Sequence, residues 1–422
     1  MKRSFIHAAD LHLGRPFSDL PEIFGITDIC NNACLEAFKN IIDIAIKKSV
    51  DFVLFAGDNF DSEEQDLSTK LLFIKGLKKL ADNNIKSYII CGNHDPVDLY
   101  KQIYGYFKFE DKYKDFIHIT GVTCEELQKS YEEEDYIVHS ISFKNSEAAD
   151  LTSLLPEKIN RKFNIGLIHC DLDKTESKYA PCSRENLRIL DYNYYALGHI
   201  HLPEKKETNI IYAGTHQGRT KKETGAHGCF YVEFENNEII SVDFLPTDCV
   251  RFNSVEIDCT GFDSAENIFD KIMEVAKERK ENVNLNLFEI TLKGISNSYE
   301  QISNCENILE EFYKTTDFNL PDIKIYKINN KIIPEINDFE LLNNQGVIGI
   351  LANCFTENTG INTDEIYDNI YKTHETIYKK TELDDEVKET LKSSLMVDKE
   401  EIINRVKNEL KMICKELSST EK

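Results

Sequence analysis

Residues 4–12 read SFIHAADLH, an apolar run that ends abruptly in a carboxylate and an imidazole. The run at 4–9 has the length and character of a buried strand, so Asp10 and His12 are expected just beyond its carboxyl end. A helix is predicted to follow from about residue 28 to 48, because apolar side chains recur there every three to four residues. A strand, a polar cluster and a helix in this order indicate a layered α/β domain.

Four further apolar runs also end in polar clusters. Residues 52–56 precede Gly57 and Asp58, 87–91 precede Gly92, Asn93, His94 and Asp95, 163–168 precede His169, and 194–197 precede Gly198, His199 and His201. The carboxyl ends of strands in open α/β sheets meet along one edge, where ligands bind, so we expect these residues to converge. With the remaining strand-like runs they predict an α+β fold, a four-layer α/β/β/α sandwich of two sheets packed face to face with helices outside.

The sequence predicts three regions. Residues 1–250 carry the polar clusters. Residues 251–333 read as a β-α-β-α-β unit, which is expected to form a smaller α/β cap domain. Residues 334–422 are expected to be helical. The last helix has one apolar face, which packs on its own domain or docks on a partner. That face consists of Ile402, Val406, Leu410, Ile413 and Leu417.

The composition bounds the partners and the compartment. The formal net charge of −24 argues against nucleic acid as a partner. However, residues 158–222 hold twelve Lys and Arg and seven Asp and Glu, which fits either a mixed solvated surface or a phosphate-binding face. No apolar run is long enough to span a membrane or to serve as a secretory signal. The twelve cysteines form no C-x-x-C pair, so a cytoplasmic protein with reduced thiols is expected.

The residue types in the polar clusters indicate a reaction class. Carboxylates, imidazoles and one amide, without a thiolate, suit divalent ions such as Mn²⁺, Fe²⁺ or Zn²⁺. Two such ions about 3.5–4 Å apart can activate a water and hold a phosphate for in-line attack. The sequence therefore predicts a two-metal phosphoesterase. Its candidate ligands are Asp10, His12, Asp58, Asn93, His169, His199 and His201.

The ordered series of clusters resembles the motifs of the calcineurin-like metallophosphoesterases. The opening FIHAADLHLG at 5–14 resembles the SbcD-type DNA repair nucleases. YAPCS at 179–183, YYALGHIH at 194–201 and GTHQGR at 214–219 are similar to the YhaO branch of that family. The resemblance covers about residues 3–250.

This resemblance implies roles for the site residues. One ion would be held by Asp10, His12 and His201, the other by Asn93, His169 and His199, with Asp58 bridging. His94 would lie beside the ions and stabilise the transition state or protonate the leaving oxygen. Asp95 could orient His94. The chain departs from the family pattern at Asp61, where some members have histidine, and at His216, so no role is predicted for either residue.

The resemblance also implies a function. We expect a Mn²⁺-dependent DNA exonuclease or endonuclease subunit for DNA repair, with an SMC-like ATPase partner of the YhaN or SbcC kind and with homodimerisation as a further option. Arg219, Lys221 and Lys222 are predicted to contact substrate phosphates. Two alternatives remain open: a phosphatase or cyclic-nucleotide phosphodiesterase, which the same metals could serve, and a scaffold subunit for the ATPase. The complete ligand set argues against the scaffold, and the two extra regions argue against a small-molecule enzyme.

Overall fold

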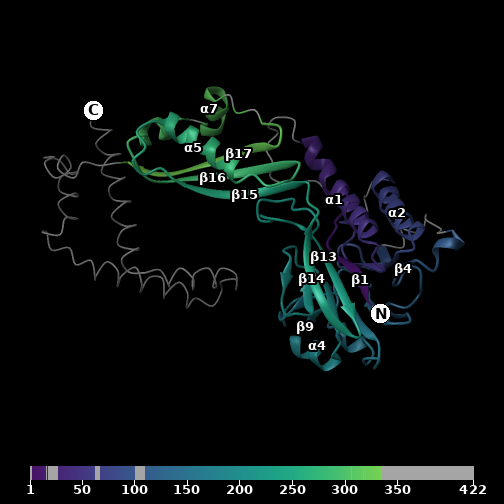
Figure 1. Ribbon diagram of the computed structural model, residues 1–422. Helices are drawn as coiled ribbons and strands as arrows, with labels where there is room; N and C mark the ends of the chain where they lie inside the picture. Colours follow the sequence, from purple (N-terminus) through teal and green to yellow (C-terminus); the bar gives the residue numbers. More distant parts are fainter. Residues whose placement is uncertain are drawn as a thin grey trace, which may run out of the picture. The chain divides into compact units, whose positions relative to one another are not determined.

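The computed structural model describes the larger part of the chain as far as residue 334 (Figure 1). The described residues are 2–15, 17, 27–61, 67–99, 110–305, 307–316, 318 and 320–334. They form two compact units. The first holds the chain as far as Val255, together with Ala276–Glu289 and the start of the last strand, and the second holds Glu256–Val275, Ile290–Phe318 and the end of that strand. Apart from Pro334, the region predicted to be helical, with its docking helix, lies outside the described residues.

The first sheet of the first unit contains four parallel strands and an antiparallel hairpin. Its strands, in spatial order, are β14 (Glu238–Pro246), β13 (Gly228–Glu235), β1 (Arg3–Ala8), β2 (Phe52–Ala56), β3 (Lys86–Ile90) and β4 (Ile117–Ile119). The strands from β1 to β4 run in the same direction, and β13 runs antiparallel to β1. The carboxyl ends of β1, β2 and β3 therefore lie at one edge of the sheet.

The second sheet of this unit is also mixed. Its strands, in spatial order, are β11 (Glu204–Lys205), β12 (Ile210–Tyr212), β10 (Tyr194–Gly198), β7 (Phe163–His169), β6 (Tyr136–Ile141) and β5 (Gln128–Glu132). β6, β7, β10 and β12 are parallel, so β7 and β10 end side by side. A separate short pair joins β8 (Asp171–Leu172) to β9 (Pro181–Cys182).

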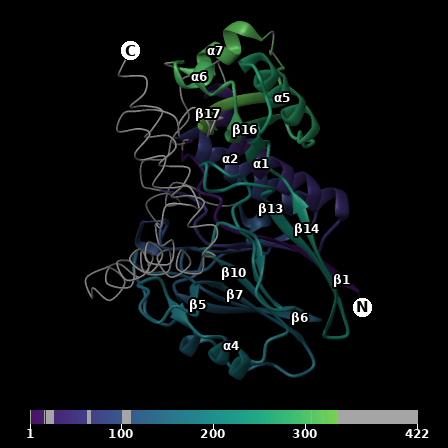
Figure 2. The same cartoon turned by 90° about the vertical axis from the view of Figure 1, so that its left-hand side faces the viewer.

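The central strands are buried on both faces, as parallel strands in layered folds are. In β1, Phe5 packs in the cluster between the two sheets, whereas Ile6 packs in the cluster beneath the helices α1 (Thr27–Lys48) and α2 (Leu67–Asp82). Leu187 of α4 (Arg184–Leu190) packs in the cluster that contains Ile168 and Leu197 of the second sheet. Figure 2 shows α1 and α2 on one side of the strands and α4 on the other. The predicted four-layer α/β/β/α sandwich is confirmed.

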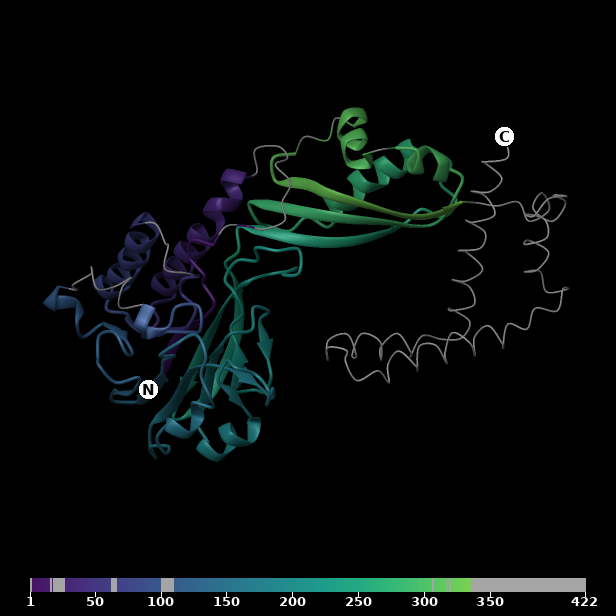
Figure 3. The ribbon, with the colours of Figure 1, turned by 180° about the vertical axis from the view of Figure 1, so that it is seen from behind.

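A three-stranded sheet contains β15 (Val250–Asp258), β16 (Leu285–Ser296) and β17 (Ile323–Pro334) in this order. The helices between these strands in sequence are α5 (Ala265–Glu278), α6 (Tyr299–Ser303) and α7 (Ile308–Thr315). Figure 3 shows α5 and α7 on the same face of the sheet, and their rings Phe269 and Phe312 have centroids 5.5 Å apart. Sequence periodicity predicted one helix where α6 and α7 are separate, because the side chain of Asn307 accepts a hydrogen bond from the backbone N of Glu310 and starts α7 anew.

Two short 3₁₀ helices, η1 (Asp111–Tyr113) and η2 (Thr152–Leu154), are also present among the described residues. Within the described part of the chain, no helix combines the length and the apolar character needed to cross a membrane.

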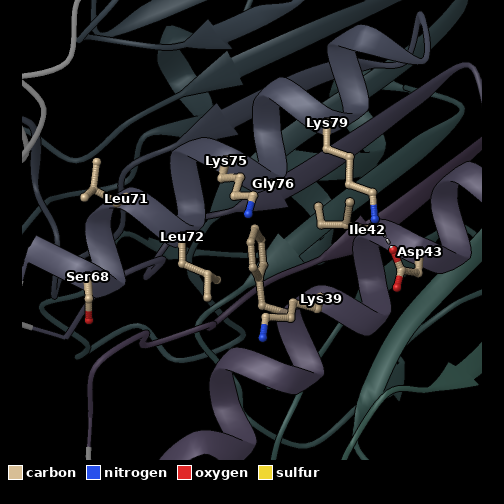
Figure 4. Close-up of a pocket in the computed structure, with 10 residues that line it drawn as sticks. Lys39, Ile42, Asp43, Ser68, Leu71, Leu72, Lys75, Gly76 and Lys79 are labelled. Carbon is tan, nitrogen blue, oxygen red and sulfur yellow. Dashed lines mark hydrogen bonds and ion pairs between the residues drawn. The ribbon is translucent and has the colours of Figure 1, made fainter.

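The contact between α1 and α2 depends on a glycine. A Cβ atom at Gly76 would lie 2.6 Å from the ring of Phe38, which is fully buried and stacked on Phe73. A surface groove of about 520 Å³ runs between the two helices (Figure 4). On its rim, Nζ of Lys79 lies 2.6 Å from a carboxylate oxygen of Asp43 and links the helices. The close approach of α1 and α2 therefore requires glycine at this position.

We predict that Gly76→Ala destabilises the protein. Alanine favours the helix by about 1 kcal/mol, but overpacking against a ring that cannot move costs about 1–3 kcal/mol. Urea unfolding should show a lower free energy of unfolding for Gly76→Ala than for the wild type. Lys75→Ala, at an exposed position of the same helix, should change it by less than about 0.5 kcal/mol. Equal stability of Gly76→Ala and the wild type would mean that α1 and α2 are packed less closely.

His7 is a buried imidazole in the layer between the sheets. Its Nε2 donates to the carbonyl oxygen of Leu197 (3.2 Å), so its Nδ1 accepts from the hydroxyl of Tyr194 (3.0 Å). Burial lowers the pKa of His7 from 6.5 to about 3. The folded protein thus keeps this imidazole neutral at pH values where the unfolded chain takes up a proton.

This difference predicts acid sensitivity. The stability that neutral His7 provides is complete above pH 6.5 and is lost as pH falls toward 3, by up to about 1.4 kcal/mol per pH unit. In His7→Gln the titrating group is absent, so chemical unfolding between pH 6 and 4 should show a shallower loss of stability than in the wild type. Parallel curves for the two proteins would contradict the burial of a neutral His7.

Candidate metal centre

The predicted ligands follow five strands whose carboxyl ends meet at one edge of the sandwich. Asp10 and His12 follow β1, Asp58 follows β2, Asn93 follows β3, His169 ends β7, and His199 and His201 follow β10. Four of these residues have positive φ angles, which non-glycine residues adopt at a cost of about 1–3 kcal/mol each. The angles are 50° at Asp10, 41° at His12, 51° at Asp58 and 105° at His199. Strained backbone concentrated at one edge is typical of a functional site.

Backbone hydrogen bonds hold these strained turns together. The backbone N of Asp10 donates to the oxygen of Gly57 (3.1 Å), and that of His12 donates to the oxygen of Asp58 (2.9 Å). The backbone N of His199 donates to the carboxylate of Asp10 at 3.0 Å. The turns after β1, β2 and β10 are therefore fixed to one another.

Two glycines give the ligands room. A Cβ at position 92 would lie 2.2 Å from Oδ1 of Asp58. A Cβ at position 198 would lie 2.0 Å from the carbonyl oxygen of Ala56 and 2.9 Å from Nδ1 of His169. Gly92 and Gly198 thus permit the backbone to pass directly beside the side chains of the site.

His12 and His201 form the first ligand pair. Their Nε2 atoms lie 3.1 Å apart. Nδ1 of His12 lies 2.9 Å from Oδ1 of Asp61, and Nδ1 of His201 lies 2.6 Å from Oε1 of Glu223. Carboxylates accept hydrogen bonds, so each Nδ1 carries the proton and each Nε2 presents a lone pair to the other. Two converging lone pairs without a proton between them suit a shared cation.

His169, Asn93 and His199 form the second ligand set. Nδ1 of His169 donates to the carbonyl oxygen of Ala56 (2.9 Å), which leaves the lone pair on Nε2. That Nε2 lies 3.0 Å from Oδ1 of Asn93, and the same oxygen lies 3.2 Å from Nδ1 of His199. These three side chains thus converge, as the sequence predicted for the second ion.

Asp58 lies between the two sets. Its Oδ2 is 3.7 Å from Nε2 of His12 and 3.4 Å from Nε2 of His169. Donor atoms of Asp10, His12 and His201 lie within 4.8 Å of one another, and so do those of Asp10, Asp58 and His169. The nitrogen and oxygen donors fit two divalent ions of the Mn²⁺, Fe²⁺ or Zn²⁺ kind, with Asp58 placed to contact both.

The charges of the buried site are balanced only in part by its histidines. Burial raises the pKa of Asp10. Burial acts in the same direction on Asp58, but the neighbouring His169 and His12 outweigh it and lower the pKa of Asp58. Burial would lower the pKa of His169, yet the Asp58 carboxylate raises it to about 9. The site thus attracts positive charge, which a cation supplies in place of a proton.

His94 lies at the rim of the site. Its side chain is 41% exposed, and its ring centroid is 4.9 Å from that of His12. Its Nδ1 lies 3.4 Å from Oδ1 of Asp61, which is also the partner of His12. Asp61, for which the sequence predicted no role, therefore contacts two histidines of the site.

The prediction that Asp95 orients His94 needs correction. Asp95 is fully buried, and its carboxylate accepts hydrogen bonds from the backbone N atoms of Gly92 (2.7 Å), Asp58 (3.1 Å) and Asn59 (2.8 Å). It therefore ties together the turns that follow β2 and β3. The carboxylate next to His94 is that of Asp61, with Oδ1 3.4 Å from Nδ1 of His94.

The three residues predicted to contact substrate phosphates differ in their exposure to solvent. Lys221 and Lys222 are exposed, but Arg219 is only 2% exposed. Among the described residues, Nε and Nη1 of Arg219 have no hydrogen-bond partner, and Nη2 lies 3.9 Å from Oε1 of Glu223. Arg219 is therefore an interior cation and not a surface contact.

The structure adds residues that the sequence did not single out. An open cleft of about 680 Å³ adjoins the site and is lined in part by His94, Asn93, Lys144 and Tyr179. The ring of Tyr179 is 39% exposed, with its centroid 5.2 Å from that of His199. Lys144 belongs to no cluster at a strand end. Tyr179 opens the YAPCS stretch at 179–183, but that motif assigned it no role at the site.

Comparison with known proteins identifies the family of this chain. Residues 3–203 match the family described as calcineurin-like phosphoesterase. An uncharacterised metallophosphoesterase of Bacillus subtilis, YhaO, is 31% identical over 288 residues, which cover 64% of this chain and 68% of that protein. The DNA double-strand break repair protein Mre11 of Methanocaldococcus jannaschii is 27% identical over 296 residues, which cover 63% of this chain and 73% of that protein. Among solved structures, a dimetal phosphatase from Danio rerio has a TM-score of 0.32 at 10% identity and covers 55% of this chain and 92% of that one. The chain belongs to the calcineurin-like metallophosphoesterase family and is a phosphoester hydrolase.

Proposed function

We propose that this hydrolase is a Mn²⁺-dependent DNA exonuclease or endonuclease of the SbcD and YhaO kind, acting in DNA repair. The observation that carries the proposal is the convergence of two ligand sets on Asp58, beside an open cleft of about 680 Å³. Two bound divalent ions would lower the pKa of an attacking water and neutralise the phosphate charge.

The side chains around the ions have distinct tasks in this proposal. Asp10, His12 and His201 would hold one ion, Asn93, His169 and His199 would hold the other, and Asp58 would lie between the two sets. His94, at the rim and in contact with Asp61, protonates the leaving oxygen. Asp61 fixes both His94 and His12 through one carboxylate oxygen.

The cleft favours a polymer over a compact substrate. The exposed ring of Tyr179 lies beside His199 and offers a face on which a base can stack. Lys144, together with Lys221 and Lys222, supplies exposed positive charge for backbone phosphates. The similarity to Mre11, a DNA double-strand break repair protein, supports the same substrate class.

The proposal extends to domains and partners. We place the nuclease domain at 1–250 and the cap domain, which would guide DNA, at 251–333. An SMC-like ATPase of the YhaN or SbcC kind is the proposed partner, with a homodimer as the proposed assembly. The similarity to YhaO and Mre11 supports these assignments.

We predict that metal binding and proton transfer can be separated by mutation. His94→Ala should keep two ions per chain by elemental analysis yet lose about 10²–10⁴-fold in kcat, because a positioned acid supplies a factor of that size. Asp58→Ala should lose metal and activity together, because it removes the ligand between the two sets. If His94→Ala loses an ion, His94 is a ligand and the proposed acid role is wrong.

We also predict that Lys144, which lines the cleft, and the exposed Lys221 and Lys222 act on DNA alone. The variant Lys144→Gln/Lys221→Gln/Lys222→Gln should bind DNA more weakly and with a smaller salt dependence, by about one unit of log–log slope per lost contact. Hydrolysis of bis(p-nitrophenyl) phosphate should be unchanged. Lys47→Gln, near the end of α1 and the opposite edge of the sheet, is the matched control.

Equal losses on both substrates would favour the small-molecule phosphodiesterase. Metal binding without turnover of either substrate would favour the scaffold subunit.

A further inference from the structure

The imidazole of His201 is hydrogen-bonded to Glu223 on the side away from His12. Nδ1 of His201 donates to Oε1 of Glu223 at 2.6 Å, and Nε2 of His201 faces Nε2 of His12 at 3.1 Å. Glu223 is 8% exposed, so little water competes for this hydrogen bond. The tautomer of His201 therefore depends on the carboxylate of Glu223.

The second carboxylate oxygen of Glu223 is also engaged. Oε2 accepts hydrogen bonds from the backbone N atoms of Arg219 (2.7 Å) and Thr220 (3.2 Å). The backbone N of Glu223 donates back to the oxygen of Thr220 (3.0 Å), which closes the turn. Both ends of the carboxylate thus face hydrogen-bond donors, and the side chain has one orientation that satisfies them.

The loop that carries Glu223 is tied directly to the metal centre. The backbone N of Thr215 donates to the oxygen of His201 (2.8 Å), and the hydroxyl of Thr215 donates to the carbonyl oxygen of Asp10 (2.8 Å). A change in the position of this loop would therefore reach two predicted ligands. The loop is part of the site although none of its side chains was predicted to bind metal.

Arg219 places a buried positive charge beside this carboxylate. Its side chain is 2% exposed, and its Nη2 lies 3.9 Å from Oε1 of Glu223. A buried guanidinium is costly unless an anion lies close to it. The carboxylate of Glu223 is the anion that approaches it here, so each charge favours the buried position of the other.

We propose that Glu223 is the positioning residue of His201, because it keeps the proton on Nδ1 and the lone pair on Nε2. The buried guanidinium of Arg219 holds Glu223 in this position. The inference rests on the proposed function only in taking His201 as a metal ligand. It replaces the sequence-based expectation that Arg219 contacts substrate.

Glu223→Gln tests the proton placement with almost no change of volume. A glutamine oxygen can face either His201 or the backbone N atoms of Arg219 and Thr220, and the amide NH₂ must then face the other. With the oxygen on the backbone donors, the NH₂ donates to Nδ1 of His201 and moves the imidazole proton to Nε2, which can no longer bind metal. Glu223→Gln should therefore be nearly as harmful to metal binding as Glu223→Ala.

The experiment measures the affinity of the full-length protein for Mn²⁺ by titration calorimetry and the absorption spectrum of the Co²⁺-loaded protein. We expect about 10–100-fold weaker binding of one of two ions in Glu223→Gln, with a changed Co²⁺ spectrum. Arg219→Met should weaken the binding of the same ion. Lys47→Met, at an exposed position near the end of α1, should leave both measurements unchanged.

A double-variant cycle separates positioning from a merely structural role. In a His201→Ala background, Glu223→Gln should cause no additional loss of Mn²⁺ affinity, because its action passes through His201. Unchanged affinity and Co²⁺ spectrum in the folded single variant would overturn the inference, as would an equal additional loss in the His201→Ala background. If the wild type binds no Mn²⁺, the proposed function fails instead, so the two failures are distinguishable.

Discussion

The candidate metal centre depends on the close contact between His12 and His201, whose Nε2 atoms lie 3.1 Å apart. His12 follows β1 of the first sheet, and His201 follows β10 of the second. They meet only because the two sheets pack face to face through a shared apolar layer that includes Phe5, Tyr194 and Ala196. The core of the sandwich therefore sets the spacing of the candidate metal centre, and a change in sheet packing would alter that spacing.

The structure holds this edge with hydrogen bonds to backbone and to carboxylates. The positive φ angles of Asp10, His12 and Asp58 are costly, and the turns that contain them are tied to one another. Asp95 accepts backbone hydrogen bonds from the turns after β2 and β3, and Glu223 does so from its own loop. In the proposed centre, the buried acids Asp10 and Asp58 would face the ions, whereas Asp95 and Glu223 fix neighbouring backbone and side chains.

The layers and the convergence of the seven candidate residues could be predicted from the sequence, because each candidate closes an apolar run and the ends of parallel strands meet. The contact of Glu223 with His201 could not be predicted, because Glu223 lies on a loop and no periodicity indicates which loop folds back beside His201. Arg219 was misplaced because a run of Lys and Arg normally faces water, and its burial depends on a carboxylate four residues later. Asp95 was misread because adjacency to His94 in sequence says little about contact, whereas Asp61, from another strand, makes that contact.

Anomalous diffraction from crystals grown with Mn²⁺ tests the proposed two-metal centre most directly. Two anomalous peaks are expected, about 3.5–4 Å apart as in two-metal sites, with Asp58 contacting both. One peak should lie against His12 and His201, and the other against Asn93, His169 and His199. A single peak, or two peaks bound by other side chains, would contradict the proposed centre and the chemistry derived from it.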